Sequence, residues 1–194
     1  MFVDRDKFWN DRYIKMDKKQ KTDSFLTRNR HLLPVKGQAL DLACGLGENA
    51  IFLAKCNLQV DGWDFSEIAI DQLKKEAERQ GVDISTKVWD VTAGDWPEEQ
   101  YDVVTVSRFL DRSIAPSLIR VLKPGGLLFY KTFVHLTVDG KGPANPAFRL
   151  GKNELLSLFF PALELVFYQE EWEIGSGGSE DRDSAFFIGR RPVT

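Results

Sequence analysis

The sequence predicts an α/β fold, a doubly wound and mostly parallel sheet of seven strands that ends in an antiparallel hairpin. Three observations carry this prediction: short apolar runs alternate with helical stripes from Gln38 onward, a glycine turn at Gly45–Gly47 follows the first run, and no helical stripe separates the last two runs. With 43% hydrophobic residues, the 194-residue chain can bury a full core, so we expect a single domain. Within it, residues 1–34 are predicted as an N-terminal helical cover and residues 35–194 as the core.

The N-terminal segment shows two helical features. Trp9, Tyr13 and Met16 recur at helical spacing, and the stretch Ser24–Leu33 is closed by Pro34. Both are predicted as helices that precede the main fold.

The core begins with strands that each lead into a helix. Ser66 is a typical cap for the start of the second core helix, and Gly81 is typical of its end. Pro124 to Gly126 predict the end of the helix that follows the fourth strand. The predicted parallel strands are Ala39–Ala43, Leu58–Trp63, Ile84–Trp89, Tyr101–Val106 and Leu127–Phe133.

The C-terminal part is predicted as a short helix followed by a hairpin. Leu155, Leu158 and Phe159 share the inward face of this helix, which Pro161 ends. No helix lies between the last two strands, which are therefore expected to pair antiparallel. Their predicted ranges are Leu163–Trp172 and Ala185–Arg190.

Composition narrows the class of protein. The net charge of -3 gives no general attraction to nucleic acid or to an anionic membrane. Cys44 and Cys56 are expected to be reduced thiols without a metal, and no stretch approaches the ~18 apolar residues of a membrane helix. The start of the chain lacks the apolar core of a signal peptide, so we expect a cytoplasmic protein. A local basic cluster is interpreted as solvated surface, with a steering patch for an acidic partner as the alternative: Lys15, Lys18, Lys19, Lys21, Arg28 and Arg30.

The glycine turn and Asp41 bear on the choice of cofactor. Gly45-x-Gly47-x-x-Ala50 is compatible with a dinucleotide site, and Asp64 lies near the place of a ribose-binding acid. A carboxylate at Asp41, however, would face the helix N-terminus that a pyrophosphate needs. S-adenosylmethionine (SAM) has no phosphate and carries an ammonium and a sulfonium cation, so the acid favours SAM over NAD.

Two further acids end the second and third strands. Asp64 can accept hydrogen bonds from both ribose hydroxyls, and Asp90 from an adenine amino group. Phe65 and Val91 are placed to sandwich the adenine ring. The alternative for each acid is a turn or helix-cap residue. Because we place Asp64 outside the strand end, we also expect its replacement to change the stability of the fold little.

These residues resemble those of the class I SAM-dependent methyltransferases: Asp41–Gly47 matches their glycine motif, Gly62–Asp64 their ribose acid and Asp90 their adenine acid. The resemblance covers roughly the whole chain and implies a Rossmann-like methyltransferase fold with SAM as cofactor. The sequence is similar in more detail to the tellurite-resistance-type branch, through motifs typical of shared descent. These motifs are Phe8-Trp9-x-x-Arg12-Tyr13, Lys123-Pro124-Gly125-Gly126, Lys131-Thr132-Phe133 and Gly142-Pro143-x-Asn145-Pro146-x-Phe148.

The resemblance also implies roles for the N-terminal aromatics. Trp9, Arg12 and Tyr13 resemble the family's cover over the cofactor, with simple packing as the alternative. Cys44, beside the glycine turn, is interpreted as structural. The predicted cofactor-binding set is Trp9, Tyr13, Asp41, Ala43, Gly45, Gly47, Asp64, Phe65, Ser66, Asp90, Val91, Ser107 and Arg108.

Acceptor-side residues are expected after strands four and five. In-line methyl transfer depends largely on holding the acceptor aligned, so no fixed catalytic residue is predicted. His135 is either an ordinary loop residue or a general base, and Arg108 forms either a surface salt bridge or an acceptor or cofactor contact. Two positions depart from the family pattern: Lys131 replaces an acid, and Arg112-Ser113 replaces an Arg-Pro pair. The other candidates near the acceptor are Asp111, Arg112 and Tyr130.

The predicted function is methyl transfer from SAM to a small molecule, with a chalcogen oxyanion or a thiol as candidate acceptors. The alternatives are a SAM-binding protein without turnover and a NAD-dependent oxidoreductase. Neither an Asn-Pro-Pro-aromatic motif nor a Pro-Cys nucleophile is present in the sequence, so nucleic acid is not expected as the acceptor. We expect no membrane partner, and either a monomer or a homodimer.

Overall fold

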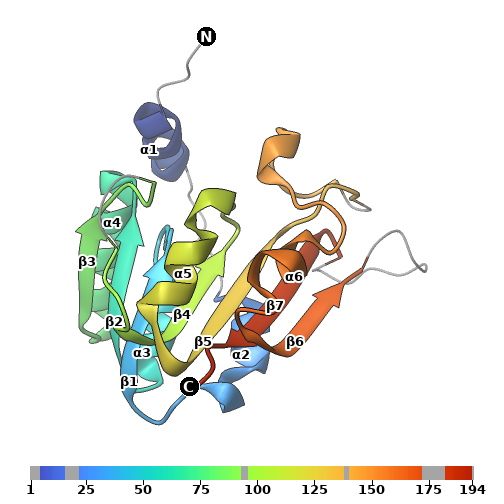
Figure 1. Cartoon of the computed structure of the whole chain (residues 1–194). Helices are drawn as coiled ribbons and strands as arrows, with labels where there is room; N and C mark the ends of the chain where they lie inside the picture. The colour runs from blue at the N-terminus through green and yellow to red at the C-terminus, as the bar shows by residue number, and fades with distance from the viewer. Residues whose placement is uncertain (1–4, 16–21, 93–95, 138–139, 172–181, 194) are drawn as a thin grey trace. The chain divides into compact units, whose positions relative to one another are not determined.

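The predicted alternation of strands and helices is confirmed in the computed structural model, which describes residues 5–15, 22–92, 96–137, 140–171 and 182–193 (Figure 1). Within these ranges, hydrogen bonds connect seven strands in the order β3-β2-β1-β4-β5-β7-β6. The chain divides into two compact units, Met1–Asp95 with Tyr101–Thr105, and Trp96–Gln100 with Val106–Thr194. The assignment of the whole chain to a single domain remains a prediction.

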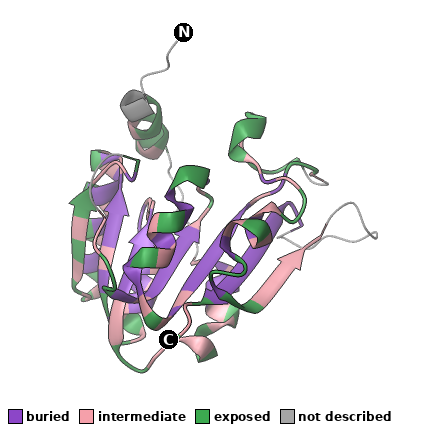
Figure 2. Cartoon of the chain, viewed as in Figure 1, coloured by how far each residue is buried: buried purple, intermediate pink, exposed green. Residues whose placement is uncertain are grey.

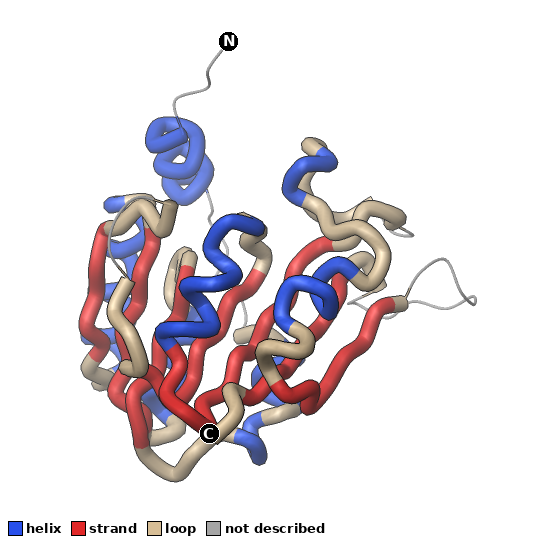
Figure 3. The backbone as a smooth tube through the Cα atoms, viewed as in Figure 1, coloured by secondary structure: helices blue, strands red, loops and turns tan. Residues whose placement is uncertain are grey.

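The first unit contains the parallel strands at the start of the order. β1 pairs with β2 from Gly37 opposite Leu58 to Leu42 opposite Trp63, and β2 pairs with β3 in the same direction. Helix α1 packs beside α4 (Figure 1; Figure 3). The elements of this unit are α1 (Arg5–Lys15), α2 (Ser24–Arg28), η1 (Arg30–Leu32), β1 (Gly37–Leu42), α3 (Glu48–Lys55), β2 (Leu58–Asp64), α4 (Glu67–Gln80), β3 (Ile84–Val88) and the first residues of β4 (Tyr101–Ser107).

Helix α4 shows why the local sequence folds as predicted. The Ser66 hydroxyl accepts a hydrogen bond from the Ala69 amide at the helix start, and Gly81 takes a left-handed conformation at its end. Between these caps, apolar side chains at helical spacing are buried, among them Ile70 and Leu73. Both predicted ends of this helix are confirmed.

The second unit contains the antiparallel part of the sheet. β7 lies between β5 and β6 and pairs antiparallel with both, which confirms the predicted hairpin. Figure 2 shows that β7 is buried along most of its length, whereas the edge strand β6 is not. Its elements are the end of β4, η2 (Arg112–Ile114), α5 (Ala115–Val121), β5 (Leu122–Phe133), η3 (Pro146–Phe148), α6 (Glu154–Phe159), β6 (Glu164–Glu170) and β7 (Ser184–Arg190).

The start of β5 differs from the prediction. Pro124 to Gly126 were expected to separate a helix from a strand beginning at Leu127, yet β5 already begins at Leu122. Gly125 adopts a φ of 81°, and its amide donates to the Arg191 carbonyl at 2.9 Å. The Arg191 amide in turn donates to the Gly126 carbonyl at 2.8 Å. The pairing of this segment with the residue after β7 therefore extends the strand through a sequence typical of a turn.

An aromatic stack forms the core of the second unit. The Phe159 ring lies 5.6 Å from the Tyr130 ring and 5.4 Å from the Phe187 ring, measured between centroids. Leu155 is also fully buried, whereas Leu158 is only half-buried. The predicted inward face of α6 is thus confirmed for Leu155 and Phe159.

None of the helices in the described ranges is both long and apolar enough to cross a membrane. No group of three or more His, Cys, Asp or Glu side chains in those ranges is arranged to hold a metal ion.

Candidate functional site

The glycine turn joins β1 to α3 through several left-handed residues. Ala43, Gly45 and Gly47 have φ values of 53°, 54° and 82°. A Cβ atom at Gly47 would lie 2.1 Å from Cδ1 of Leu73 on α4, so a side chain there would displace this buried leucine. Ala43 has a Cβ atom and still takes this sparsely populated conformation, and such strain is typical of functional turns. The turn is therefore specified by both backbone conformation and packing.

Asp41 lies near the end of β1, and its side chain reaches the N-terminus of α3. Its side chain is 1% exposed, and its Oδ2 accepts a hydrogen bond from the Ala50 amide at 2.9 Å. Burial raises the pKa of the Asp41 carboxyl, the Ala50 amide opposes this, and the negative charges of Glu48, Asp64 and Asp23 raise it further. The expected placement of this carboxylate is confirmed: it takes the helix-terminal position that would attract a phosphate.

Asp64 connects the glycine turn to helix α4. Its Oδ2 accepts from the Gly45 amide at 2.8 Å and its Oδ1 from the Ser66 amide at 2.9 Å. It is the last residue of β2 and is 5% exposed, and burial raises the pKa of its carboxyl despite these amides. The expectation that Asp64 lies outside the strand is therefore wrong. Because removing the carboxylate would leave the Gly45 and Ser66 amides without this acceptor, we now expect its replacement to destabilise the protein.

Backbone hydrogen bonds bring the three predicted acids to neighbouring strand ends. The Cys44 amide donates to the Trp63 carbonyl at 3.0 Å, and the Trp89 amide donates to the Asp64 carbonyl at 2.9 Å. The turns after β1 and β3 are thus both held against the end of β2. Asp41, Asp64 and Asp90 consequently lie at one edge of the parallel strands, where ligands bind in open α/β sheets.

Asp90 forms a local turn in this structure. Its Oδ1 accepts from the Thr92 amide at 2.9 Å and from the Thr92 hydroxyl at 2.7 Å. This is the turn role that the sequence also allows for Asp90, and the contact of Asp90 with adenine remains a prediction. Of the two predicted ring contacts, Val91 is buried and Phe65 is half-buried.

The N-terminal helix reaches the glycine turn. The hydroxyl oxygen of Tyr13 lies 3.1 Å from the position that a Cβ atom of Gly45 would take. The Tyr13 and Trp9 ring centroids are 6.0 Å apart, and the Arg12 guanidinium lies 5.6 Å from the centroid of the Trp9 ring. The predicted aromatic cover is therefore in contact with the turn, although Met16 lies outside the described residues.

Sequence reasoning missed Asn10. The Ser66 hydroxyl, which caps α4, also donates to Oδ1 of Asn10 on α1. Asn10 precedes Tyr13 by one helical turn and therefore shares its face, which is the signal that could have found it.

Burial raises the pKa of the Tyr13 hydroxyl, and the nearby Asp64 carboxylate raises it further, so the phenol stays protonated. Burial likewise raises the pKa of the Cys44 thiol, in agreement with a structural role.

The remaining predicted residues belong to the second unit. Ser107 ends β4, and Arg108 follows it with an exposed side chain and a φ of 57°. The Arg108 amide donates to the Lys131 carbonyl at 2.9 Å. The Lys131 side chain is itself 7% exposed, and its ammonium lies 5.2 Å from the centroid of the Phe186 ring.

Burial raises the pKa of Tyr130, whose hydroxyl donates to the Phe109 carbonyl at 3.1 Å. Tyr130 is therefore held in the protein interior as a protonated donor.

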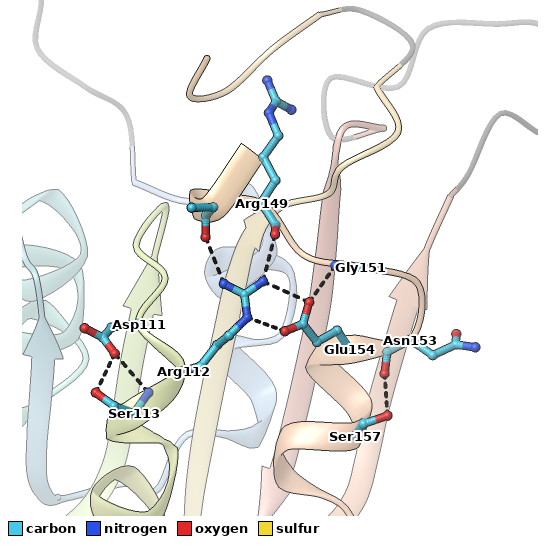
Figure 4. A network of polar contacts seen from close by, with 9 residues as sticks. Asp111, Arg112, Ser113, Arg149, Gly151, Asn153, Glu154 and Ser157 are labelled. Carbon is cyan, nitrogen blue, oxygen red and sulfur yellow. Dashed lines mark hydrogen bonds and ion pairs between the residues drawn. The ribbon is translucent and has the colours of Figure 1, made fainter. Parts of the chain in front are cut away.

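Arg112 is the centre of a polar network in the second unit (Figure 4). Its guanidinium donates to the Ala147 carbonyl at 2.8 Å and to the Arg149 carbonyl at 3.0 Å. It also contacts both carboxylate oxygens of Glu154 at the start of α6. These contacts lower the pKa of the Glu154 carboxyl, mainly through the hydrogen bond from Arg112. Asp111, another candidate, caps η2 by accepting from the Ser113 amide at 2.9 Å.

Comparisons with known proteins agree with this geometry. Residues 39–126 match the methyltransferase domain family. A probable SAM-dependent methyltransferase, TehB of Haemophilus influenzae, is 32% identical over 142 residues, which cover 69% of this chain and 48% of that protein. A ubiquinone biosynthesis O-methyltransferase of Coxiella burnetii is 32% identical over 52% of this chain and 45% of that protein. The chain thus spans about half the length of the curated relatives it matches.

Solved structures show the same fold. The crystal structure of TehB from Haemophilus influenzae superposes with a TM-score of 0.74 at 22% sequence identity, over 94% of this chain and 67% of that chain. A second solved structure concerns the conversion of a disulfide bond into a thioacetal group during echinomycin biosynthesis. It superposes with a TM-score of 0.73 at 20% sequence identity, over 97% of this chain and 92% of that chain. The predicted fold class is therefore confirmed.

Proposed function

Because the chain is a class I SAM-dependent methyltransferase of the TehB-like branch, we propose that it transfers the methyl group of SAM to a small-molecule acceptor. The observation that carries this proposal is the position of Asp41, whose carboxylate accepts from the Ala50 amide at the start of α3. A phosphate cofactor would have to compete with this charge, whereas a cationic one gains from it. Glu48, Asp64 and Asp23 add to the same negative field.

We assign the cofactor contacts to the first unit as follows. The left-handed turn at Ala43, Gly45 and Gly47 lets the methionyl part approach the backbone, with Asp41 nearest to its cations. The Asp64 carboxylate offers about four acceptor positions in all, and beside the Gly45, Ser66 and Phe65 amides it can still accept from a ribose hydroxyl. Asp90, Phe65 and Val91 are assigned to the adenine.

The proposed chemistry needs little from the chain beyond alignment. A lone pair of the acceptor attacks the methyl carbon, the bond from carbon to sulfur breaks, and the sulfonium becomes a neutral thioether. Tyr130 is buried and its hydroxyl donates to the Phe109 carbonyl, so it is not proposed as the base. His135 is exposed after β5, with its amide bonded to the Leu150 carbonyl at 2.8 Å.

Acceptors that are already anionic or strongly nucleophilic suit this arrangement. Chalcogen oxyanions carry negative charge at neutral pH, and thiols ionise more readily than alcohols, so neither depends on a strong base in the protein. This supports the two acceptor classes named from the family resemblance. A base at His135 would instead favour phenols, which lose a proton during the reaction.

Binding and turnover measurements test the proposed function. We expect calorimetry to show saturable binding of SAM and S-adenosylhomocysteine and no comparable binding of NADH. We also expect methyl transfer to at least one of selenite, tellurite, 2-mercaptoethanol and catechol, followed by mass spectrometry of the products. Tight SAM binding without product from any of them would favour a binding protein without turnover. Saturable NADH binding without SAM binding would favour an oxidoreductase.

The N-terminal cover gives a separate prediction. Deleting residues 1–16 removes Asn10 and Tyr13 from the Ser66 cap and the glycine turn. We expect the deletion to weaken SAM binding about tenfold, because the site would lose covering contacts worth roughly one hydrogen bond. Circular dichroism should show that the sheet remains folded. Tyr13→Phe, which keeps the ring, is the matched control and should bind SAM nearly as well as the wild type. Complete unfolding of the deletion variant would mean that α1 is core packing and not a cover.

A further inference from the structure

The segment 145–151 forms a short strap at the carboxyl end of β5. Val134 forms a bridge with Leu150, the Leu150 amide donates to the Phe133 carbonyl at 2.9 Å, and the His135 amide donates to the Leu150 carbonyl at 2.8 Å. The strap therefore continues directly from the strand end where a ligand is expected in this class of fold. It also carries Phe148, which is 53% exposed.

We propose that Arg112 is a positioning residue that, with Glu154, holds this strap in one conformation and so determines which acceptors the enzyme uses. The inference rests on the proposed function and adds to it the residue that controls acceptor selection. Figure 4 shows the guanidinium between the strap and α6. One planar side chain thereby joins three segments of the second unit, namely η2, the strap and the first turn of α6.

The strap depends on these contacts because its own structure is small. Its one regular element is η3, a 3-10 helix of three residues, with the Phe148 amide donating to the Asn145 carbonyl at 3.1 Å and the Arg149 amide to the Pro146 carbonyl at 3.0 Å. Such short helices are weak by themselves. Arg112 binds the Ala147 and Arg149 carbonyls, which lie in and directly after this turn.

Glu154 and Arg149 complete the attachment at both ends. The Glu154 Oε2 accepts from the Gly151 amide at 2.6 Å as well as from Arg112 at 3.0 Å. The Arg149 side chain donates to the Pro143 carbonyl at 2.7 Å and to the Val134 carbonyl at 3.0 Å. The strap is thus held to α6 on one side and to the end of β5 on the other.

The Ser113 departure from the family pattern fits this role. The Ser113 amide donates to Asp111 Oδ1 at 2.9 Å, and its hydroxyl donates to the same oxygen at 2.6 Å. A proline at this position has no amide hydrogen and could not form the first bond. In this chain the cap at Asp111 fixes the turn from which Arg112 projects.

The test compares Arg112→Lys, Glu154→Gln and Arg112→Ala with the wild-type protein. Lysine keeps the charge but cannot form the forked contacts of the guanidinium, so it separates geometry from charge. Arg120→Ala is the matched control, because Arg120 is exposed on α5 and contacts Ser117 at 3.2 Å and Glu98 at 3.9 Å. Circular dichroism and thermal melting show whether each variant is folded. If Arg112→Ala does not fold, Arg112→Lys still tests the proposal.

In Arg112→Lys and Glu154→Gln we expect amide hydrogen exchange at Phe148 to Gly151 to rise about tenfold or more. SAM affinity should stay within about twofold, because the cofactor residues keep their contacts. The ratio of kcat/KM for selenite to that for 2-mercaptoethanol should change about tenfold, mainly through the acceptor KM. The Arg120→Ala variant should match the wild type in all three measurements.

Unchanged exchange in the strap overturns the proposal, and so does faster exchange with an unchanged selectivity ratio. If the wild type methylates neither probe, the proposed acceptors are wrong. The role of Arg112 is then tested by measuring how tightly selenite binds to the complex with S-adenosylhomocysteine in the wild type and in Arg112→Lys. Weaker selenite binding in Arg112→Lys supports the inference. Equal binding, or none in either protein, overturns it.

Discussion

Asp64→Ala is expected to weaken SAM binding about 10- to 150-fold for each ribose hydrogen bond lost, because a bond to a charged acceptor contributes about 1.5–3 kcal/mol and each ~1.4 kcal/mol is a factor of ten. The same change should also destabilise the protein. The carboxylate accepts from the Gly45 and Ser66 amides in a buried position, and leaving such donors without a partner costs about 1–3 kcal/mol. Tm should fall by about 2–4 °C for each kcal/mol.

Two matched variants separate these effects. Asp64→Asn keeps one acceptor oxygen and should lie between wild type and Asp64→Ala in both SAM affinity and Tm. Asp71→Asn, on the exposed face of α4, removes an equal charge away from the turn and should change neither. Calorimetry gives the affinity and thermal melting gives the stability. SAM affinity in Asp64→Ala equal to that of the wild type would contradict the ribose assignment, even if its Tm falls.

The order of strands and helices could be predicted because the sequence pattern is local. Ser66 and Gly81 specify the ends of α4 through contacts within a few residues, and both are confirmed. The beginning of β5 could not be predicted in this way. Its hydrogen bonds to Arg191 join residues far apart in the sequence, and they override the turn preference of Pro124 to Gly126.

The candidate site shows the same division. The acids could be found because Asp41 lies in a predicted strand just before the glycine turn, and Asp64 and Asp90 each follow a predicted strand directly. Their hydrogen-bond partners could not, since the sequence does not show that the Asp64 carboxylate already accepts from Gly45 and Ser66. The position of Arg112 after the fourth strand likewise predicts only that it lies on the acceptor side. Its contacts with Ala147 and Glu154 depend on a loop that folds back over many residues.

The second large effect is expected for Asp41→Asn, which should weaken SAM binding about tenfold or more, as the loss of a charged partner implies. Burial and neighbouring acids raise the pKa of the Asp41 carboxyl in the folded protein above its ordinary value of about 4. In the window between that ordinary value and the raised one, the folded state binds more protons than the unfolded state. The free energy of unfolding without ligand therefore falls as pH rises through this window.

Asparagine imitates the protonated acid and can still accept from the Ala50 amide, so Asp41→Asn should lose this pH dependence and should melt at a higher Tm than wild type near neutral pH. SAM, which brings cations to the carboxylate, should lower its pKa and release a proton on binding to the wild type but not to the variant. Calorimetry in buffers of different ionisation enthalpy measures that proton. NADH affinity should be unchanged or higher in Asp41→Asn, since removing a negative charge from the start of α3 favours a phosphate. Equal SAM affinity in the two proteins, with no difference in proton release, would remove Asp41 from the cofactor site and leave it as a helix cap.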